Sequence, residues 1–283
     1  AVGPEVQADN IGKVYVGAKA SEAEVKARYD GLYWFVFRDF GFRHGLLDSL
    51  MTSPRASYHA FSHARSALTG KRFNGRVTSG DAGLDTQAYA YEFEDPATGR
   101  RIWVAWRSDG REAEVALPCR VDSLATTELA YGPSTEVRAA AAGADGWLRI
   151  RVGARPVFVS EPATARISRP DVVVDSLRVT TPAPRAGERL DVVVYLRNVG
   201  NRPTPAGSPV AVVLSMDDAE AGRATVRSRV TDATTVTVSV RLPASAAGSR
   251  LLSAVANPDA RFVELDTDNN TAYLRLAVLP QGR

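Results

Sequence analysis

The spacing of hydrophobic residues changes twice along the chain, and these changes divide the sequence into three blocks. In the first block, residues 1–70, apolar side chains such as Val6, Ile11, Val14 and Tyr15 recur at helical intervals. This spacing predicts an amphipathic helix near the start of the chain.

Two more elements are expected in the first block. Residues 31–37 are almost continuously apolar, which is typical of a strand buried on both faces, as in a parallel sheet. Residues 57–68 return to helical spacing, with Ala64 and Leu68 on one side and Gly70 as the stop signal. The first block is therefore predicted to form a helix, a strand and a helix.

The second block, residues 71–162, has a hydrophobic period of two, which predicts β-strands. The expected strands are residues 88–93, 102–106, 114–117, 136–137, 147–150 and 156–159. Turn residues separate these segments, as at 95–100, and the regular alternation of strands and turns indicates an antiparallel β-sandwich.

The third block, residues 170–283, follows a short linker at 163–169 that is rich in Ala and Arg, and we expect few contacts in this linker. The expected strands of the block are residues 172–174, 190–196, 210–214, 235–240, 251–255 and 272–278. Pro, Gly, Asn and Asp fill the gaps, and no helical pattern is present. One further all-β domain is therefore predicted.

Composition excludes several classes of protein. The chain has 283 residues, enough for two or three domains. Its net charge is +3 and no run of Lys or Arg exceeds two residues, whereas a nucleic-acid-binding protein gathers positive charge on one stripe. The most apolar stretch, residues 32–36, is far shorter than the ~20 residues of a membrane span. The single cysteine, Cys119, excludes an intrachain disulfide. No cofactor is expected.

Three segments of the third block carry a resemblance to a known family. They are residues 170–174 (PDVVV), 196–201 (LRNVGN) and 263–270 (VELDTDNN). Over residues 170–279 the block resembles a CARDB domain, a cell-adhesion-related, Ig-like module of bacterial and archaeal surface proteins. The resemblance implies a secreted bacterial protein, located outside the cell or on its surface.

The acidic segment near the end of this block allows two interpretations. Asparagine tolerates left-handed backbone and hydrogen-bonds its own chain, so Asn198, Asn269 and Asn270 suit hairpin turns. Alternatively, Glu264, Asp266, Asp268 and Asn270 place oxygen ligands at alternate positions, as a calcium site requires. Turn chemistry is the interpretation that we favour, and calcium is the alternative.

Residues 34–41 (WFVFRDFG), 45–48 (GLLD) and 53–61 (SPRASYHAF) carry a second resemblance. They are similar to the eighth strand and last helix of the TIM barrel in retaining, clan-A glycoside hydrolases. The second block is similar to the β-sandwich that many of these enzymes pack beside the barrel. Retaining hydrolysis needs two carboxylates ~5–5.5 Å apart, and the resemblance places both of them upstream of residue 1. We therefore expect no catalytic residue in this chain.

The predicted fold class is mainly β. We expect two β-sandwich domains, an accessory one at 71–162 and an Ig-like one at 170–283, joined by the linker at 163–169. They are preceded by an α/β segment at 1–70 that resembles the last strand and helices of a TIM barrel.

Five side chains are candidates for sugar binding. Trp34 would end a barrel strand at the face where its ring can stack on a sugar, and Arg38 and Asp39 follow at the strand end. Trp103 and Trp106 are an odd number of residues apart, so they lie on opposite faces of their strand. We expect one of them to be buried and the other to be exposed and open to a glycan. The alternative for each of the five is a structural role.

Two functions compete. The first is a non-catalytic, C-terminal portion of a secreted bacterial glycoside hydrolase, which supports the barrel and anchors or presents it to a polysaccharide or cell-surface glycan. The second is a non-enzymatic surface protein for adhesion or carbohydrate binding. In either case the strand at 32–37 would have two apolar faces and two unpaired edges. We therefore expect a missing barrel polypeptide or an oligomer partner to cover it.

Overall fold

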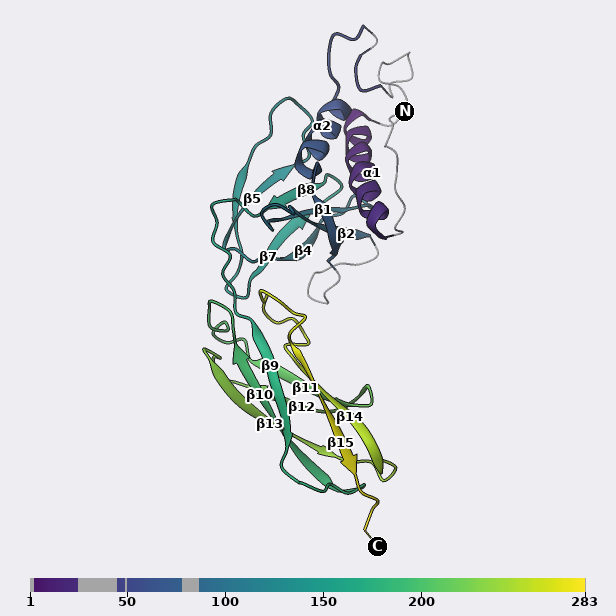
Figure 1. Cartoon of the computed structure of the whole chain (residues 1–283). Helices are drawn as coiled ribbons and strands as arrows, with labels where there is room; N and C mark the ends of the chain where they lie inside the picture. The colour runs from purple at the N-terminus through teal and green to yellow at the C-terminus, as the bar shows by residue number, and fades with distance from the viewer. Residues whose placement is uncertain (1–2, 25–44, 49, 78–86, 283) are drawn as a thin grey trace. The chain divides into compact units, whose positions relative to one another are not determined.

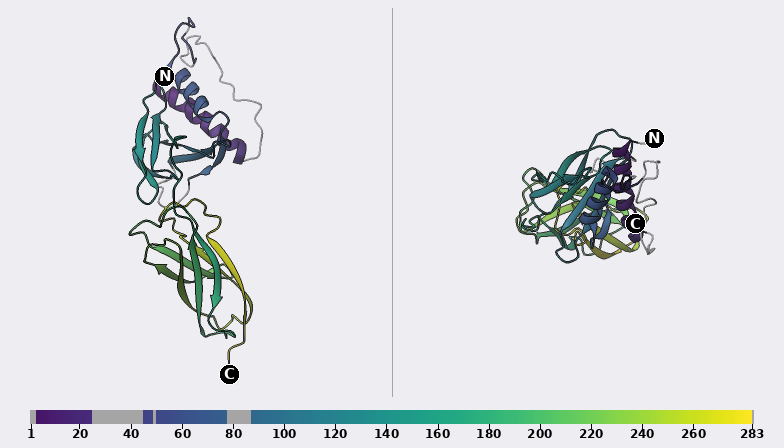
Figure 2. Two further views of the ribbon diagram at one scale, coloured as in Figure 1. Left: turned by 60° about the vertical axis from the view of Figure 1, so that its left-hand side comes forward. Right: turned by 90° about the horizontal axis from the view of Figure 1, so that it is seen from above.

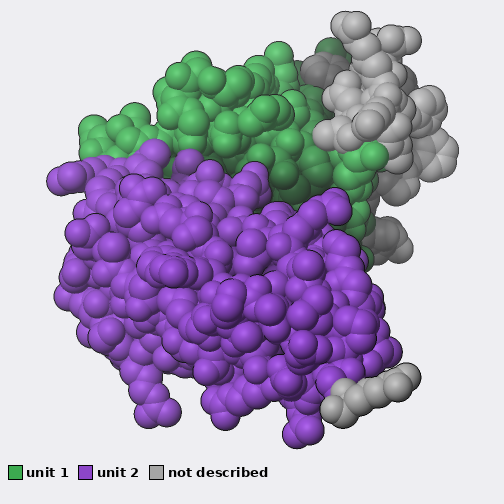
Figure 3. All heavy atoms as spheres, turned by 60° about the horizontal axis from the view of Figure 1, so that its bottom comes forward, with its two compact units in different colours: residues 1–117, 122–142, 148–165 green, residues 118–121, 143–147, 166–283 purple. Residues whose placement is uncertain are grey.

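The computed structural model describes residues 3–24, 45–48, 50–77 and 87–282. These residues divide into two compact units (Figure 3). Unit 1 comprises residues 1–117, 122–142 and 148–165, and unit 2 comprises residues 118–121, 143–147 and 166–283. The fold class is mainly β, as predicted. No helix in the described ranges is long and apolar enough to cross a membrane.

Two helices lie side by side in unit 1 (Figures 1 and 2). Helix α1 spans Pro4–Glu24 and helix α2 spans Ala56–Leu68, which confirms both predicted helices. Gly70, with a φ of +73°, follows α2 as the predicted stop. The strand expected at 31–37 lies outside the described residues.

The buried stripe of α1 differs from the predicted one. Val6 and Val14 are 50% and 48% exposed. The residues that face inward are mostly small and recur every four positions: Ala8, Gly12, Val16 and Ala20. Helix α2 buries a similar stripe: Ser57, Ala60, Ala64 and Leu68. Small side chains allow close approach, and a Cβ at Gly12 would lie only 2.6 Å from Leu129 Cδ2.

The strands of unit 1 form a six-stranded sheet in the order β1-β2-β3-β8-β5-β6 and a two-stranded sheet of β4 and β7. Every pairing within the six-stranded sheet is antiparallel. The strands are β1 (Arg72–Arg76), β2 (Ala88–Glu94), β3 (Arg101–Arg107), β4 (Ala113–Pro118), β5 (Ser123–Glu128), β6 (Arg138–Ala141), β7 (Trp147–Val152) and β8 (Val157–Ser160).

Five of the six strands predicted for the second block are confirmed as β2, β3, β4, β7 and β8. The strand predicted at 136–137 is wrong, because β6 begins at Arg138 and Val137 is 66% exposed. Strands β1 and β5 were not predicted. Both have polar or small residues at most positions, so the period-two signal is weak there.

The helices and the six-stranded sheet share one hydrophobic core. Alternate residues of β2 and β3, among them Phe93 and Val104, pack in the same cluster as Ile11 of α1 and Leu68 of α2. All four side chains are no more than 1% exposed. The helices of the first block and the six-stranded sheet of the second block therefore belong to one compact unit.

Unit 2 contains an Ig-like sandwich of two sheets (Figure 1). The first sheet has the order β13-β10-β9 and the second has the order β12-β11-β14-β15. The strands are β9 (Val172–Val179), β10 (Arg189–Asn198), β11 (Val210–Met216), β12 (Ala219–Val226), β13 (Ala233–Arg241), β14 (Gly248–Ala256) and β15 (Thr271–Val278). The sequence predicted all of these except β12, an edge strand with mostly small and polar residues.

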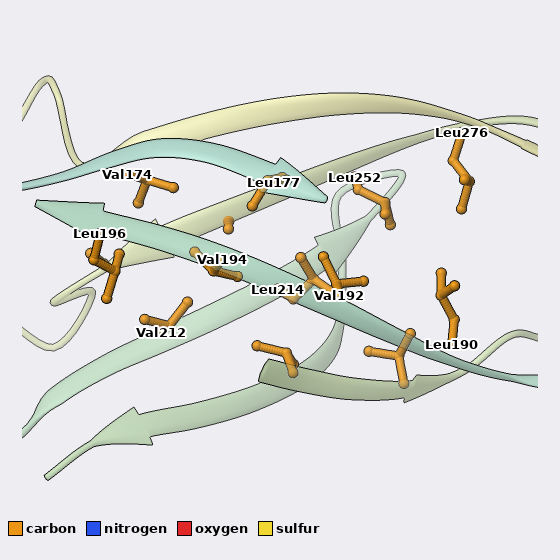
Figure 4. Close-up of a cluster of buried hydrophobic side chains, with 14 of the residues drawn as sticks. Val174, Leu177, Leu190, Val192, Val194, Leu196, Val212, Leu214, Leu252 and Leu276 are labelled. Atoms are coloured by element: carbon orange, nitrogen blue, oxygen red, sulfur yellow. The ribbon is translucent and has the colours of Figure 1, made fainter. Parts of the chain in front are cut away.

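Alternating side chains of the two sheets fill the core of this sandwich (Figure 4). In β10, Leu190, Val192, Val194 and Leu196 are at most 1% exposed. Fully burying such a side chain stabilises the fold by about 1.5–3 kcal/mol. The inward positions of β10 are two residues apart, which is the strict alternation that made this strand visible in the sequence.

The end of the predicted linker is tightly bound rather than free of contacts. Arg169 is 3% exposed. Its guanidinium donates hydrogen bonds to the carbonyl oxygens of Cys119 (2.7 Å), Val121 (2.6 Å) and Ser168 (2.7 Å), all of which belong to unit 2. A buried guanidinium requires such acceptors. The expectation of few contacts is therefore wrong for this part of residues 163–169.

The motif at 196–201 has a structural explanation in Asn198 and Gly200. Asn198 Oδ1 accepts hydrogen bonds from the backbone N–H groups of Asp171 (3.0 Å) and Gly200 (3.1 Å). Its Nδ2 donates to the carbonyls of Arg202 (2.7 Å) and Val230 (3.1 Å). The side chain thus joins three segments of chain, and it brings the backbone at Gly200 against the start of β9.

A methyl group at position 200 should destabilise unit 2. The Cβ would lie 2.5 Å from the carbonyl oxygen of Arg169 and 2.6 Å from the backbone nitrogen of Asp171, and backbone atoms cannot move aside. We expect Gly200→Ala to lower the free energy of unfolding by about 1–3 kcal/mol, measured by chemical denaturation of the full chain. Gly153→Ala, at a site with nothing within 4 Å, is the matched control. Equal effects of the two substitutions would contradict this explanation.

Candidate binding site

The structure describes two of the five sugar-binding candidates that were predicted from the sequence. Trp34, Arg38 and Asp39 lie outside the described residues. Trp103 and Trp106 point to opposite faces of β3, as predicted, since only Trp106 belongs to the core shared with the helices. However, Trp103 is 0% and Trp106 is 5% exposed. The expectation that one of them is exposed is wrong, because the sheet is covered on both faces at this point.

The Trp106 ring packs against two tyrosine rings of β2. The ring stacks on Tyr89 at 5.4 Å between centroids and on Tyr91 at 5.3 Å, with interplanar angles of 14° and 21°. Offset stacking of this kind adds to the burial of the rings. Trp106 therefore has a structural role in the sheet.

Trp103 is held by a buried polar group on the other face of the sheet. Its indole N–H donates to Glu92 Oε2 at 2.9 Å. The second oxygen of Glu92 forms an ion pair with Arg101 Nε at 3.2 Å and accepts a hydrogen bond from Asn74 Nδ2. These contacts of Glu92 link β1, β2 and β3 to one another.

The carboxylate of Glu264 accepts three hydrogen bonds. The donors are the backbone N–H of Val172 (2.7 Å), Asn257 Nδ2 (2.7 Å) and Asn270 Nδ2 (2.8 Å). Glu264 is 5% exposed. Burial raises its pKa from the ordinary 4.5 to about 7, although the hydrogen bonds act in the opposite direction.

The residues named as alternative calcium ligands serve as turn and anchoring groups. Asp266 and Asp268 are exposed, and Asp266 Oδ1 accepts a hydrogen bond from the backbone N–H of Asp268 at 2.9 Å. Asn270 is buried and also donates to the carbonyl of Ala256 at 3.3 Å. Among the described residues, no group of three or more His, Cys, Asp or Glu side chains is placed to hold a metal ion. These contacts support turn chemistry.

An open polar groove with a volume of about 390 Å³ lies in unit 1. It is bounded by β5, β6 and β8 of the six-stranded sheet, by β7 of the two-stranded sheet, and by the loop between β5 and β6. Its lining residues are Thr126, Thr127, Glu128, Ala130, Ser134, Thr135, Glu136, Arg138, Ala140, Ile150, Arg151, Arg155 and Val157.

The β-register explains why polar residues meet in this groove. Thr126 pairs with Arg138 across β5 and β6, and Glu128 pairs with Val157 across β5 and β8. Paired residues and residues two positions apart share one face of a sheet. The side chains of these four residues are therefore on the face that meets β7, where Arg151 adds another charge.

The groove contains three guanidinium groups and two carboxylates. Arg138 Nη2 is 2.9 Å from Glu136 Oε2, and Arg155 Nη1 is 2.8 Å from Glu128 Oε2. Arg151 is exposed, and no acidic side chain in the described part of the chain pairs with it. The groove therefore has an excess of one positive charge.

Arg155 is the most rigidly held of these groups. Its Nε donates to the carbonyl oxygen of Leu129 at 2.8 Å, and its Nη2 donates to the same oxygen. Its Cζ lies 3.9 Å from the centroid of the Tyr131 ring, a cation–π contact. The groove is thus lined by a guanidinium that is already oriented.

Helices α1 and α2 hold the loop beside the groove. Tyr131 donates from its hydroxyl to Asp9 of α1, whose pKa is raised by burial. His63 of α2 accepts a hydrogen bond from the backbone N–H of Ala130 through Nδ1 at 2.9 Å. Burial and then the charge of Arg155 lower the pKa of His63, which favours the neutral form that this bond requires.

The groove was not predicted from the sequence. Its side chains come from residues 126–140 and 150–157, and only the folded register brings them together. The available signal was the concentration of Thr, Arg and Glu between the apolar strand positions of these two segments.

The comparison with known protein families matches one part of the chain. Residues 169–273 match the CARDB family. These residues form a CARDB domain. The match begins at Arg169 and ends within β15, so it includes six complete strands of the sandwich in unit 2 and the start of the seventh. A comparison with curated protein sequences finds no significant match.

Solved structures resemble the chain only distantly. A CARDB domain from Pyrococcus furiosus, solved in complex with di-metal ions, is 17% identical, with 39% of this chain and 89% of that one covered and a TM-score of 0.33. Red sea bream transglutaminase (11% identity, 78% and 33% covered, TM-score 0.26) and a GH2 β-galacturonidase from Eisenbergiella tayi (13%, 72% and 44%, 0.27) also match. The chain spans less than half of each of these two proteins.

The CARDB domain should lose stability as the pH rises from about 4.5 to about 7. In this range Glu264 holds its proton in the folded state but releases it in the unfolded state, so each pH step favours unfolding. The loss is on the order of 3 kcal/mol. We expect Glu264→Gln to flatten the dependence of the unfolding free energy on pH, with a residual slope from Asp171, whose pKa is also raised by burial.

The measurement is chemical denaturation of the full chain at pH 5, 6, 7 and 8. The matched control is Asp268→Asn, which removes an exposed carboxylate from the same segment and should keep the wild-type slope. A Glu264→Gln protein with an unchanged slope would contradict the assignment to Glu264.

Proposed function

We propose that this chain is the non-catalytic accessory portion of a glycosidase-like protein, and that the groove of unit 1 binds a saccharide. The groove is the observation that carries the proposal. The CARDB domain and the sequence resemblance of residues 5–160 to clan-A glycoside hydrolases support the wider context.

The groove has the size and chemistry of a saccharide site. Its volume of about 390 Å³ falls within the range of about 300–1,000 Å³ of small-molecule sites. Paired guanidinium and carboxylate groups present hydrogen-bond donors and acceptors side by side, as a sugar with neighbouring hydroxyls requires. Ala140, Ile150 and Val157 add apolar surface for the C–H groups of a sugar ring.

The CARDB domain would present the rest of the protein. A seven-stranded sandwich with an apolar core would be a stiff spacer, and a spacer of this kind can hold a saccharide-binding unit near a polysaccharide or a cell-surface glycan. This role requires a secreted protein, outside the cell or on its surface. A barrel polypeptide, or an oligomer partner, would cover the apolar segment at 32–37.

A non-enzymatic adhesion or carbohydrate-binding protein is the second candidate, because the groove and the CARDB domain serve that role equally well. The coding sequence upstream of Ala1 distinguishes the two. A barrel of roughly 250 residues in total, with two carboxylates at the ends of its strands, would favour the glycosidase-like protein.

The isolated chain should not hydrolyse aryl glycosides, because the resemblance places both catalytic carboxylates upstream. Glu5, an exposed residue in the first turn of α1, is the nearest acidic residue to the start of the chain. The measurement is release of nitrophenol from a panel of nitrophenyl glycosides. Hydrolysis that survives repurification and disappears in Glu5→Gln would contradict the proposal.

The full chain should bind saccharides on an array that carries both neutral and acidic glycans. The expected result is retention of the wild-type chain on at least one glycan class, and loss of that binding in Ala140→Phe, which fills the groove without changing its charge. Failure to bind any neutral or acidic glycan would contradict the binding role. Binding that Ala140→Phe leaves intact would place the site elsewhere on the chain.

A further inference from the structure

We infer that the ligand of the groove is an acidic saccharide, one that bears a carboxylate or a sulfate group, and that Arg151 contacts this group. The inference rests on the proposed function and adds the chemical class of the ligand. Three features of the groove support it: the charge balance, the orientation of the guanidinium groups and the chemistry of the other walls.

The charge balance favours an anion. Two of the three guanidinium groups are paired within the groove, Arg138 with Glu136 and Arg155 with Glu128. Arg151, on β7, is exposed and has no acidic partner among the described residues. A guanidinium binds carboxylate and sulfate-like groups in a planar, two-pronged geometry, and such charge-assisted bonds are about twice as strong as neutral ones.

A second guanidinium, that of Arg155, has a fixed orientation on another wall of the groove. Arg155 uses three of its five N–H groups in the described contacts, two on the Leu129 carbonyl and one on Glu128. A ligand would use the two N–H groups that these contacts leave. The Tyr131 ring and the Leu129 carbonyl fix the orientation of the guanidinium, so a ligand that binds it loses little side-chain entropy.

The other walls favour a saccharide over a small inorganic anion. Ser134 and Thr135 contribute hydroxyl groups from the exposed loop between β5 and β6. Ala140, Ile150 and Val157 contribute apolar surface. A ligand that fills about 390 Å³ must therefore combine hydroxyl groups, C–H surface and an anionic group. An acidic sugar carries all three.

The test is isothermal titration calorimetry of the full chain with four probes. The probes are trigalacturonate, fully methyl-esterified trigalacturonate, a sulfated galactose trisaccharide and inorganic sulfate. The ester has nearly the shape of the acid without its charge. We expect the acid or the sulfated trisaccharide to bind at least about 10-fold more tightly than the ester, which corresponds to ~1.4 kcal/mol. The affinity of the anionic trisaccharide should fall as the NaCl concentration is raised, because the groove is open to water and salt screens charges there.

Two substitutions test the role of Arg151. Arg151→Gln should weaken binding of the acidic trisaccharide at least about 10-fold and leave binding of the ester unchanged. Arg178→Gln is the matched control, because it removes an exposed arginine from β9 of unit 2. Circular dichroism and the thermal midpoint of each variant report whether the fold is retained.

Four results would overturn the inference. The first is equal binding of the acid and its ester, which would leave a neutral-saccharide site and the proposed function intact. The second is an equal effect of Arg151→Gln and Arg178→Gln. The third is binding of inorganic sulfate as tightly as the acidic trisaccharides, which would indicate a simple anion site. The fourth is binding of neutral glycans on the array without binding of either acidic trisaccharide.

Discussion

The packing of helices α1 and α2 on the six-stranded sheet is the contact on which the groove of unit 1 depends. Small residues on both helices allow them to approach the sheet closely. In that position α1 supplies Asp9 to the Tyr131 hydroxyl, and α2 supplies His63 to the backbone of Ala130. Those bonds fix the loop that orients Arg155. The helices thus support the binding surface of the groove, although they cover only part of the strands that form it.

Much of the strand pattern was predictable, and the reason lies in which strands are central. Strands such as β3 and β10 have long apolar runs or strict alternation, since their side chains reach a core. Strand β12 lies at a sheet edge, and most of its residues are exposed or half-exposed. Edge strands need little apolar surface and often carry charge. Their pairing depends on neighbours that a single sequence does not reveal.

The candidate site was predicted poorly, for a related reason. Parity correctly placed Trp103 and Trp106 on opposite faces, but it could not indicate that both faces of the sheet are covered. The groove shows the opposite error, because a candidate site is present where none was predicted. Arg138, Arg151 and Arg155 look like ordinary surface residues in the sequence, and they converge only because β5, β6 and β7 meet at one point. Likewise, Glu264 stands in an acidic run but is the one carboxylate there that turns inward.

The contacts of Arg169 have a consequence for how a CARDB domain can be moved between proteins. The stretch 169–273 is continuous in sequence, but the compact unit around it includes residues 118–121 and 143–147. A transfer of the continuous stretch alone would keep the arginine and discard the carbonyls of Cys119 and Val121, so water would have to solvate the charge instead. The contacts of Arg169 therefore make the CARDB domain depend on a segment, residues 118–121, that lies outside the matched stretch. Transfer of residues 169–273 to another protein would therefore be less disruptive if Arg169 were replaced as well.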